Sequence, residues 1–465
     1  MYFSSLIFLF LYLPAVLACY YVIPFRFRNI FLLLVNLIFY GWGEPVFVII
    51  MALSVTVNYI CGYFIEKYRN NTRTAKTFLI LSVVISLGFL GVFKYTNFIT
   101  DILRRIPFLS MLPKTNIALP IGISFYTFQA MSYTIDVYRG DTKAQKSIIN
   151  FGTYVSFFPQ LIAGPIVRYR DIAVQLVERR ENLTQFASGI RRFTVGLCKK
   201  VLIANQMGVL WDALRPMGAE AGVLGSWVGI IAYAFQIYFD FSAYSDMAIG
   251  LGRMFGFEFI ENFNYPYISK SITEFWRRWH ISLSTWFRDY VYIPLGGNRR
   301  GVPRQIFNLF VVWALTGIWH GANVNFLLWG LYFFVLLAAE KFIYGKYLQK
   351  LPKAVRLVYA MFFVTVGWVL FYFEDFGELT AFAAQLFTGA NGVIGHDALS
   401  VTLSFLPLLA AAAVGSTPLL RNIGKRLEGS AIYRSAEIAM CVCALLLCTA
   451  ALVSQSYNPF LYFRF

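Results

Sequence analysis

Twelve apolar runs constrain this chain of 465 residues more than any other feature, because each is suited to cross a lipid bilayer as a helix. A spanning helix needs about 20 apolar residues, and several runs are shorter, so their ends are approximate. We therefore predict an all-α membrane protein that crosses the bilayer many times. The runs are 3–23, 30–42, 46–65, 78–96, 117–137, 201–214, 224–250, 306–320, 323–340, 357–373, 403–415 and 436–453.

The composition supports this prediction. Hydrophobic residues make up 58% of the chain and charged residues 14%, whereas a soluble domain carries about 25% charged residues. A soluble enzyme and a disordered chain are both excluded. Six cysteines show no metal-binding spacing. No repeat or flexible linker interrupts the sequence, so we expect a single membrane domain over residues 1–465.

Two further apolar stretches, 148–166 and 275–295, are interrupted by prolines and charged residues. Irregular backbone is tolerated at membrane depth only inside protein or beside water. We therefore expect both stretches to be re-entrant or interfacial segments.

The basic residues follow the threading that the apolar runs suggest. Loops on alternate sides of the runs hold 34 of the 40 Lys and Arg residues on one side, which the positive-inside rule assigns to the cytoplasm. Both termini then lie outside the cell membrane. The same rule accounts for the net charge of +17, so we expect no nucleic-acid partner.

His320 is one of three histidines, and it ends an apolar run. On a helix, the small residues Thr316 and Gly317 would flank it, and we expect them to leave space for a substrate beside the imidazole. An ionisable side chain at membrane depth is a candidate functional residue. Histidine suits base catalysis because its usual pKa is about 6.5. A core histidine bonded to a backbone carbonyl is the alternative, and the residues alone leave both open.

His280 lies in an aromatic and cationic segment. At helical spacing Arg277, His280, Ser284 and Arg288 would share one face. This spacing predicts a cationic wall of a buried channel that holds an anionic substrate. The alternative is an amphipathic helix at the membrane interface, with its tryptophans as anchors and its arginines reaching into water.

Two acids, Asp240 and Asp246, lie in an unusually polar part of the run 224–250. We expect them to pair with the arginines near His280 or to face water. The third histidine, His396, lies in an acidic loop, where we expect it to be solvated and without a role.

Several motifs resemble the membrane-bound O-acyltransferases. Phe-Trp-Arg-Arg-Trp-His-Ile-Ser-Leu-Ser at 275–284, with Trp-Phe-Arg-Asp-Tyr at 286–290, resembles the signature of that family. Tyr-Ile-Pro-Leu-Gly-Gly-Asn-Arg at 292–299 resembles its alginate O-acetyltransferase branch, and Gly-Ile-Trp-His-Gly at 317–321 resembles its second histidine motif. The resemblance extends from the first span to about residue 345, and segments 158–166 and 239–246 add to it.

The resemblance implies a fold and a reaction. The fold would be a ring of about 11–13 transmembrane helices around a buried centre, with the catalytic core at about 117–345. A cytoplasmic acyl thioester, either acetyl-CoA or a phosphopantetheine-linked acyl group, would meet an external hydroxyl there. No bound cofactor or metal is implied. Membrane lipid surrounds such a protein, and its acceptor would be an extracellular polysaccharide or a secreted protein that relays the acetyl group.

The resemblance also assigns roles to residues. His320 would be the essential histidine, acting as general base on the acceptor hydroxyl, and His280 would be its partner in orienting the donor or stabilising the oxyanion. The predicted substrate-binding residues are Arg277, Arg278, Ser284, Arg288, Asp240, Asp246, Trp279 and Trp319.

Three other functions compete with acetyl transfer to a polysaccharide. The first is D-alanyl transfer from a carrier protein toward teichoic acid, which the motif at 292–299 disfavours. The second is a glycan transporter without catalysis, which would need no paired histidines. The third is acyl transfer onto a lipid or a secreted protein.

Overall fold

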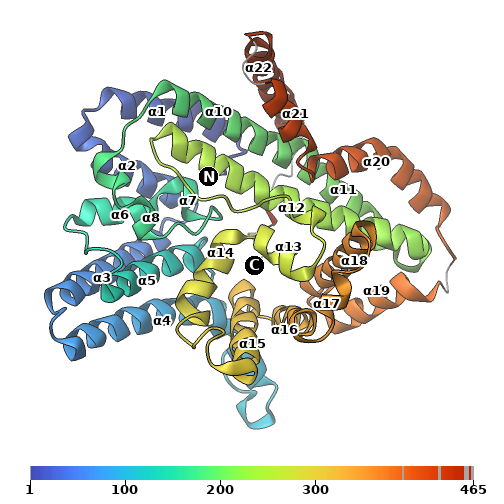
Figure 1. Cartoon of the computed structure of the whole chain (residues 1–465), viewed down its shortest axis with the longest axis horizontal. Helices are drawn as coiled ribbons and strands as arrows, with labels where there is room; N and C mark the ends of the chain where they lie inside the picture. Colours follow the sequence, from blue (N-terminus) through green and yellow to red (C-terminus); the bar gives the residue numbers. More distant parts are fainter. Residues whose placement is uncertain (1, 390–391, 428–430, 455–459, 462–465) are drawn as a thin grey trace. The chain divides into compact units, whose positions relative to one another are not determined.

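The chain forms helices joined by loops in a computed structural model (Figure 1). The structure describes residues 2–389, 392–427, 431–454 and 460–461, and none of these residues lies in a strand. Seven helical stretches of the described residues are long and apolar enough to cross a bilayer. The prediction of an all-α, multi-pass membrane protein is confirmed.

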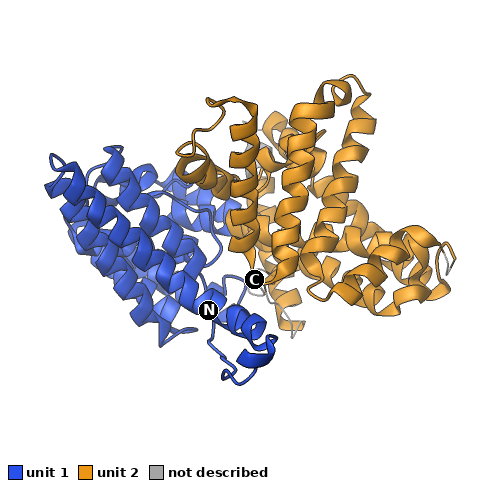
Figure 2. Cartoon of the chain, turned by 90° about the horizontal axis from the view of Figure 1, so that it is seen from below, with its two compact units in different colours: residues 1–193, 247–260 blue, residues 194–246, 261–465 orange. Residues whose placement is uncertain are grey.

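The residues group into two compact units, shown in different colours in Figure 2. Unit 1 comprises residues 1–193 and 247–260, and unit 2 comprises residues 194–246 and 261–465. Two long helices contribute to both units: α10 (Leu183–Cys198) and α12 (Gly222–Met254). The expectation of a single membrane domain stays a prediction.

Unit 1 contains the N-terminal helices. Buried side chains link α3, α4 and α5: Ser82 Oγ donates to Asn58 Oδ1 at 2.7 Å and lies 2.9 Å from Thr134 Oγ1. Such hydrogen bonds hold apolar helices together where lipid offers no hydrophobic driving force. The helices are α1 (Leu13–Val22), α2 (Phe25–Gly41), α3 (Phe47–Lys67), α4 (Thr72–Arg104), α5 (Ile123–Arg139), α6 (Ile148–Ser156), α7 (Phe158–Leu161), α8 (Tyr169–Ile172) and α9 (Gln175–Glu178), with a π-helical turn η1 (Phe8–Tyr12) and a 3₁₀ turn η2 (Pro107–Leu109).

Unit 2 contains every candidate site residue. Its α-helices are α11 (Asn205–Leu214), α13 (Ile272–Arg278), α14 (Ile281–Phe287), α15 (Gly301–His320), α16 (Val324–Ala339), α17 (Gly345–Leu348), α18 (Lys353–Tyr372), α19 (Phe376–Thr388), α20 (His396–Gly415), α21 (Leu419–Leu427) and α22 (Ala431–Ser454). The shorter turns are π-helical in η3 (Lys199–Ala204), η6 (Arg288–Tyr292) and η7 (Glu340–Tyr344), and 3₁₀ in η4 (Arg215–Ala221) and η5 (Pro266–Ile268).

An aromatic core fills unit 2. Its fully or nearly fully buried rings include Trp211, Trp329 and Trp368, which come from α11, α16 and α18. Beside this core, α15 and α16 form a hairpin with two glycines at the contact. A Cβ on Gly317 would lie 2.4 Å from the Phe326 carbonyl oxygen, and one on Gly330 would lie 2.4 Å from the Trp313 carbonyl oxygen. Small residues allow this close approach of two helix backbones.

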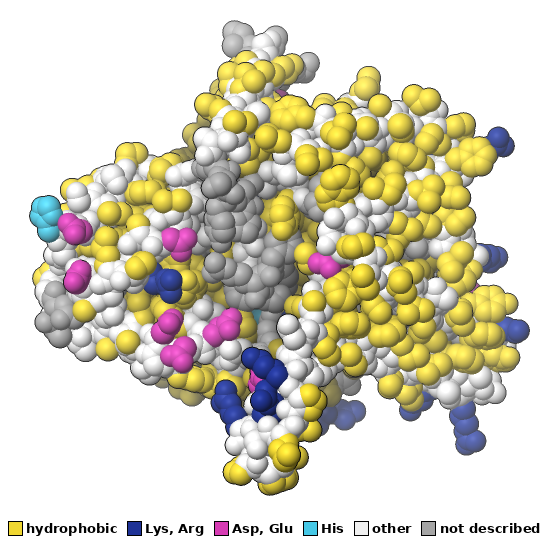
Figure 3. Space-filling model, turned by 180° about the vertical axis from the view of Figure 1, so that it is seen from behind, with side chains coloured by type: hydrophobic (Ala, Val, Ile, Leu, Met, Phe, Trp, Pro, Cys, Tyr) yellow, Lys and Arg dark blue, Asp and Glu magenta, His cyan; other side chains and the backbone are white. Residues whose placement is uncertain are grey.

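Each of the twelve predicted runs overlaps a helix, although residues 117–122 of the run 117–137 precede α5 and are not helical. Hydrophobic side chains also cover much of the surface that Figure 3 shows, as expected of a protein in lipid. For example, Leu403 on α20 is 56% exposed and Leu446 on α22 is 66% exposed. The placement of both termini outside the membrane stays a prediction.

The two interrupted stretches have an irregular backbone, and their expected re-entrant or interfacial position stays a prediction. Residues 148–166 form the short helices α6 and α7, and residues 275–295 span α13, α14 and η6. Each stretch therefore lacks a helix long enough to cross a membrane.

Candidate functional site

The segment around His280 is not one helix. Ser271 caps α13 by accepting the Glu274 N–H, and the helix ends at Arg278. Trp279 is extended, and His280 has φ 44° and ψ 54°, in the left-handed region. A non-glycine residue there costs about 1–3 kcal/mol and persists only where the surrounding contacts enforce it, often at functional sites. The chain then re-enters a helix at Ile281.

This break overturns the cationic wall predicted around His280. The His280 side chain is buried, whereas Arg277, Ser284 and Arg288 are exposed. The left-handed residue rotates the second helix relative to the first, so the 3.6-residue periodicity does not carry through position 280. The arginines can still attract phosphate at the protein surface, but they do not line a buried channel with His280.

His280 lies among aromatic rings and one amide. The Phe241 ring centroid is 4.7 Å away, edge-on, and the Trp319 centroid is 6.0 Å away. His280 Nδ1 lies 3.2 Å from Asn262 Oδ1. Burial lowers the pKa of His280 to about 3, so the imidazole is neutral at physiological pH.

His320 is the last residue of α15 and is 8% exposed, so its predicted helical and buried position is confirmed. Its ring lies 5.0 Å from Trp329 and 5.4 Å from Phe371. The expected space beside it at Gly317 is absent, because the backbone of Phe326 occupies that side. The glycine serves helix packing instead.

Trp319 brings the two histidines together. Its ring centroid lies 5.0 Å from that of His320 and 6.0 Å from that of His280. One indole therefore contacts both imidazoles, although their motifs are 40 residues apart. The predicted pairing of the two histidine motifs at one centre has this geometric support.

The two acids of α12 do not pair with the arginines near His280. Asp240 Oδ1 accepts from Lys200 Nζ at 2.5 Å, and Asp246 Oδ2 accepts from Lys199 Nζ at 2.7 Å. The Lys200–Asp240 pair is almost fully buried, and the Leu461 N–H also donates to Asp240 at 2.7 Å. The expectation of an arginine partner is wrong because α10 continues through η3 and places both lysines beside α12.

The remaining predicted residues have local partners. Arg278 binds Glu274 one helical turn earlier, with a nitrogen–oxygen distance of 2.9 Å, and donates to the Asn264 carbonyl. Arg288 binds its neighbour Asp289 at 2.8 Å. Trp279 is a core residue, with its ring 4.9 Å from that of Trp368 and stacked on Phe275 at 5.5 Å.

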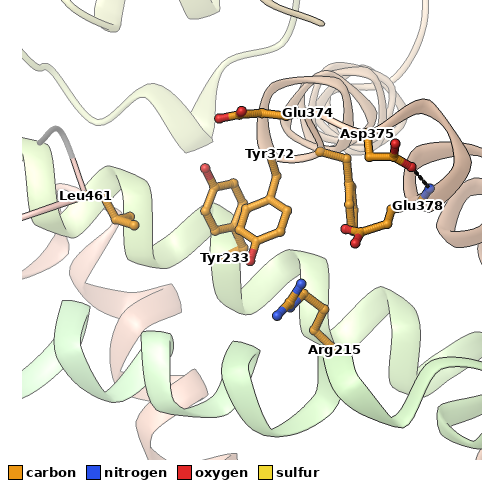
Figure 4. A pocket seen from close by; sticks show the side chains of 8 residues that line it. Arg215, Tyr233, Tyr372, Glu374, Asp375, Glu378 and Leu461 are labelled. Atoms are coloured by element: carbon orange, nitrogen blue, oxygen red, sulfur yellow. Dashed lines mark hydrogen bonds between the residues drawn. The ribbon is translucent and has the colours of Figure 1, made fainter. Parts of the chain in front are cut away.

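A pocket of about 310 Å³ opens where α18 ends. Figure 4 shows its lining, in which the rings of Tyr233 and Tyr372 lie beside Arg215 and three carboxylates. The Arg215 guanidinium lies 5.8 Å from the Tyr372 ring centroid. The preceding residue, Phe371, contacts His320, so the pocket wall and the histidine centre share one stretch of α18. The lining residues are Arg215, Tyr233, Tyr372, Phe373, Glu374, Asp375, Glu378 and Leu461.

Metal-ligand side chains do not gather in the described residues: no three of His, Cys, Asp or Glu there could hold one ion together.

Comparison with known proteins identifies the class of reaction. Residues 142–375 match the model of MBOAT, the membrane-bound O-acyltransferase family. The chain belongs to this family. It is 41% identical to a probable alginate O-acetylase of Azotobacter vinelandii over the whole of both chains. A peptidoglycan O-acetyltransferase of Helicobacter pylori is 31% identical, covering 84% of this chain and 80% of that protein.

A teichoic acid D-alanyltransferase of Bacillus subtilis is 30% identical over 56% of this chain and 70% of that protein. The resemblance found in the motifs is thus confirmed, and the chain is a membrane-bound O-acyltransferase. The hypothesis of a glycan transporter without catalysis is therefore rejected.

Two further buried residues, Glu340 and Asn262, lie outside the motifs, so the sequence does not single them out. Glu340 is buried, and its carboxylate accepts the first two N–H groups of α13, from Ile272 at 2.8 Å and Thr273 at 3.0 Å. A carboxylate at a helix N-terminus satisfies unpaired donors and opposes the helix dipole. Asn262 contacts His280 from an irregular loop. A polar residue outside any motif does not reveal in the sequence that it is buried or which residue it contacts.

Proposed function

We propose that this membrane-bound O-acyltransferase moves an acetyl group from a cytoplasmic thioester to a hydroxyl on the external side of the membrane. The acceptor belongs to a polysaccharide or to a secreted protein that relays the acetyl group. The observation that carries the proposal is the buried pair of histidines joined by Trp319, in a chain related over its whole length to a probable alginate O-acetylase.

The reaction needs a base but no protein nucleophile. His320 takes the proton of the acceptor hydroxyl as the oxygen attacks the thioester carbonyl. The new C–O bond forms, the C–S bond breaks, and the thiolate leaves with the proton that His320 carries. His280 orients the reactants beside His320. The aromatic surroundings exclude water, which limits loss of the acyl group by hydrolysis.

The donor approaches a cationic surface. Arg277 and Arg288 are exposed next to the His280 turn, and exposed guanidinium groups bind phosphate in fixed geometry. Acetyl-CoA or a phosphopantetheine arm carries such phosphate. Arg277→Gln and Arg288→Gln should therefore raise the apparent donor KM and leave kcat nearly unchanged, whereas Arg73→Gln on an exposed part of α4 is the control.

The acceptor enters on the other side, through the pocket at the end of α18. Tyrosine rings and carboxylates suit sugars, because rings pack on C–H faces and carboxylates accept from hydroxyl groups. The full-length relation to an alginate O-acetylase, against 56% coverage for the D-alanyltransferase, favours acetyl over D-alanyl transfer.

The test is the ester content of surface polysaccharide, measured by mass spectrometry. Cells lacking the chain are restored with the wild type, with His320→Ala or with His396→Ala. The third variant is a matched control, because His396 is 94% exposed at the start of α20. We expect O-acetyl groups with the wild type and the control only. If the D-alanyl ester content of teichoic acid changes while the O-acetyl content stays constant, acetyl transfer is refuted in favour of D-alanyl transfer.

A further inference from the structure

The side chain of Asn262 connects the turn at His280 to α12. Its Oδ1 accepts from the Ser282 N–H at 3.2 Å and from Ser282 Oγ at 2.9 Å, and it lies 3.2 Å from His280 Nδ1. Its Nδ2 donates to Ser245 Oγ at 3.0 Å. Asn262 is fully buried, so its amide forms its hydrogen bonds with protein groups and not with bulk water.

The backbone of Ser282 fixes which way the amide points. A backbone N–H can only donate, so the atom of Asn262 that it contacts must be the oxygen. That oxygen cannot donate, and His280 Nδ1 faces it. A neutral imidazole carries its proton on one nitrogen only. Therefore Nδ1 holds the proton of His280, and Nε2 holds the free lone pair.

The other ring nitrogen is available for substrate. His280 Nε2 is buried and has no hydrogen-bond partner among the described residues. The ring contacts Phe241 and Trp319, and Trp319 also contacts His320. A buried nitrogen without a partner is unfavourable, and a hydroxyl or amide N–H of a bound substrate would offset this cost.

We propose that Asn262 is a positioning residue that holds His280 as the Nδ1–H tautomer, so that Nε2 meets the substrate as a hydrogen-bond acceptor beside His320. This inference rests on the proposed transfer reaction. It gives His280 a different role from the expected stabilisation of the oxyanion, because a neutral Nε2 with a lone pair accepts and does not donate.

The backbone of the same loop enforces the strained turn. The Ile281 N–H donates to the Asn262 carbonyl and the Asn264 N–H donates to the Arg278 carbonyl, both at 2.9 Å. These two bonds lie on either side of the left-handed residue. Residues 262–264 therefore hold the backbone of His280, and the Asn262 amide determines which ring nitrogen of His280 carries the proton.

Charged groups near His280 are engaged elsewhere. On α12, Asp240 and Asp246 bind lysines. Glu261, in the loop before Asn262, has an interaction of its own. On α13, Arg278 binds Glu274, and α15 contributes the titratable ring of His320. Burial alone accounts for the lowered pKa of His280, so a new charge at position 262 would act on it directly.

The experiment compares Asn262→Leu and Asn262→Asp with the wild type. Full-length chain in membranes is supplied with acetyl-CoA, and thiol release above that of His320→Ala is recorded against pH. Loss of the tautomer-setting partner costs about 10⁴-fold in serine proteases. We expect Asn262→Leu to lower the rate at least 100-fold at equal protein level.

Asn262→Asp keeps the acceptor oxygen and adds a negative charge beside Nδ1–H. An adjacent opposite charge favours the protonated imidazole, by about 1–3 pKa units. Neutral His280 would then require a higher pH. Because burial holds the pKa of wild-type His280 at about 3, the ring stays neutral at pH 7 even after this rise. We therefore expect Asn262→Asp to stay active at pH 7, unlike Asn262→Leu.

Asn308→Leu and Asn308→Asp are the matched controls. Asn308 is also fully buried in unit 2, and its amide donates to the Gly297 carbonyl at 2.9 Å. The inference is overturned if both Asn262 variants match their Asn308 counterparts in rate, or if Asn262→Asp loses as much rate as Asn262→Leu. If the wild type releases no more thiol than His320→Ala and forms no O-acetyl ester, the proposed function fails instead.

Discussion

A single methyl group at position 317 tests whether the α15–α16 contact sets the position of His320. In Gly317→Ala the new Cβ would lie 2.4 Å from the Phe326 carbonyl oxygen and 3.2 Å from the Leu327 Cα. Ordinary van der Waals contact of a Cβ begins at 3.4 Å. Both of these neighbouring atoms belong to the backbone, so the two helices must separate locally by about 1 Å.

The two consequences differ in size. Overpacking destabilises by about 1–3 kcal/mol, and alanine recovers roughly 0.5–1 kcal/mol relative to glycine in a helix. The chain should therefore still fold. A displacement of about 1 Å in a catalytic group, in contrast, lowers a rate by about 100-fold, and His320 follows Gly317 within one helical turn. We expect nearly normal protein level with about 1% of wild-type transfer.

The assay is O-acetyl ester formation, normalised to the amount of chain in the membrane by immunoblot. Gly88→Ala is the control, because a Cβ there meets nothing within 4 Å. It should retain full activity. A Gly317→Ala rate within twofold of wild type at equal protein level would refute the claim that this close approach positions His320.

Three further predictions concern charges in unit 2. Lys200→Met should lower stability by about 3–5 kcal/mol, because it leaves Asp240 charged and buried; Lys200→Met with Asp240→Asn should recover much of this loss, as measured by thermal unfolding in detergent. Glu340→Gln should lower the unfolding temperature and the transfer rate together, since hydrogen bonds to a charged group are worth about 1.5–3 kcal/mol. Glu378→Gln should raise the apparent KM for the polysaccharide acceptor, because it replaces a pocket carboxylate that would accept from sugar hydroxyl groups, and an unchanged KM would place the acceptor elsewhere.

The positions of the helices were predictable because lipid imposes one requirement on the whole chain. Every backbone group in the bilayer must find a partner within a helix, so an apolar run of sufficient length folds as one. The run 306–320 falls within α15, and the run 357–373 coincides nearly with α18. The family motifs also identified both histidines before any geometry was known.

The break at His280 was not predictable in the same way. No proline or glycine lies between positions 274 and 290, and the spacing of Arg277, His280, Ser284 and Arg288 fits a continuous helix. The break depends on backbone hydrogen bonds from residues 262–264, which lie outside the segment whose spacing predicted the helix. Tertiary contact therefore decides the local conformation here against a periodicity that favours a helix.

The lysine partners of α12 show the converse difficulty. Lys199 and Lys200 are consecutive basic residues at the end of a polar loop in the apolar pattern, which is typical of cytoplasmic positions. In the structure they belong to η3, within a helical stretch that runs from α10 into α11. Hydropathy cannot distinguish a solvated lysine at a span end from one that is buried against an aspartate.

The positions of the two proposed catalytic histidines thus depend on residues that take no part in the proposed reaction. His320 is placed by a glycine that admits the backbone of α16, and the turn at His280 is held by the loop containing Asn262. Trp319 contacts both rings. A displacement of one histidine would therefore shift the indole and, through it, the other histidine. Substitutions at Gly317 and Asn262 should therefore fail to add when combined, because residues that act through one shared contact are coupled. A double variant whose loss equals the sum of the two single losses would show that the histidines are positioned independently.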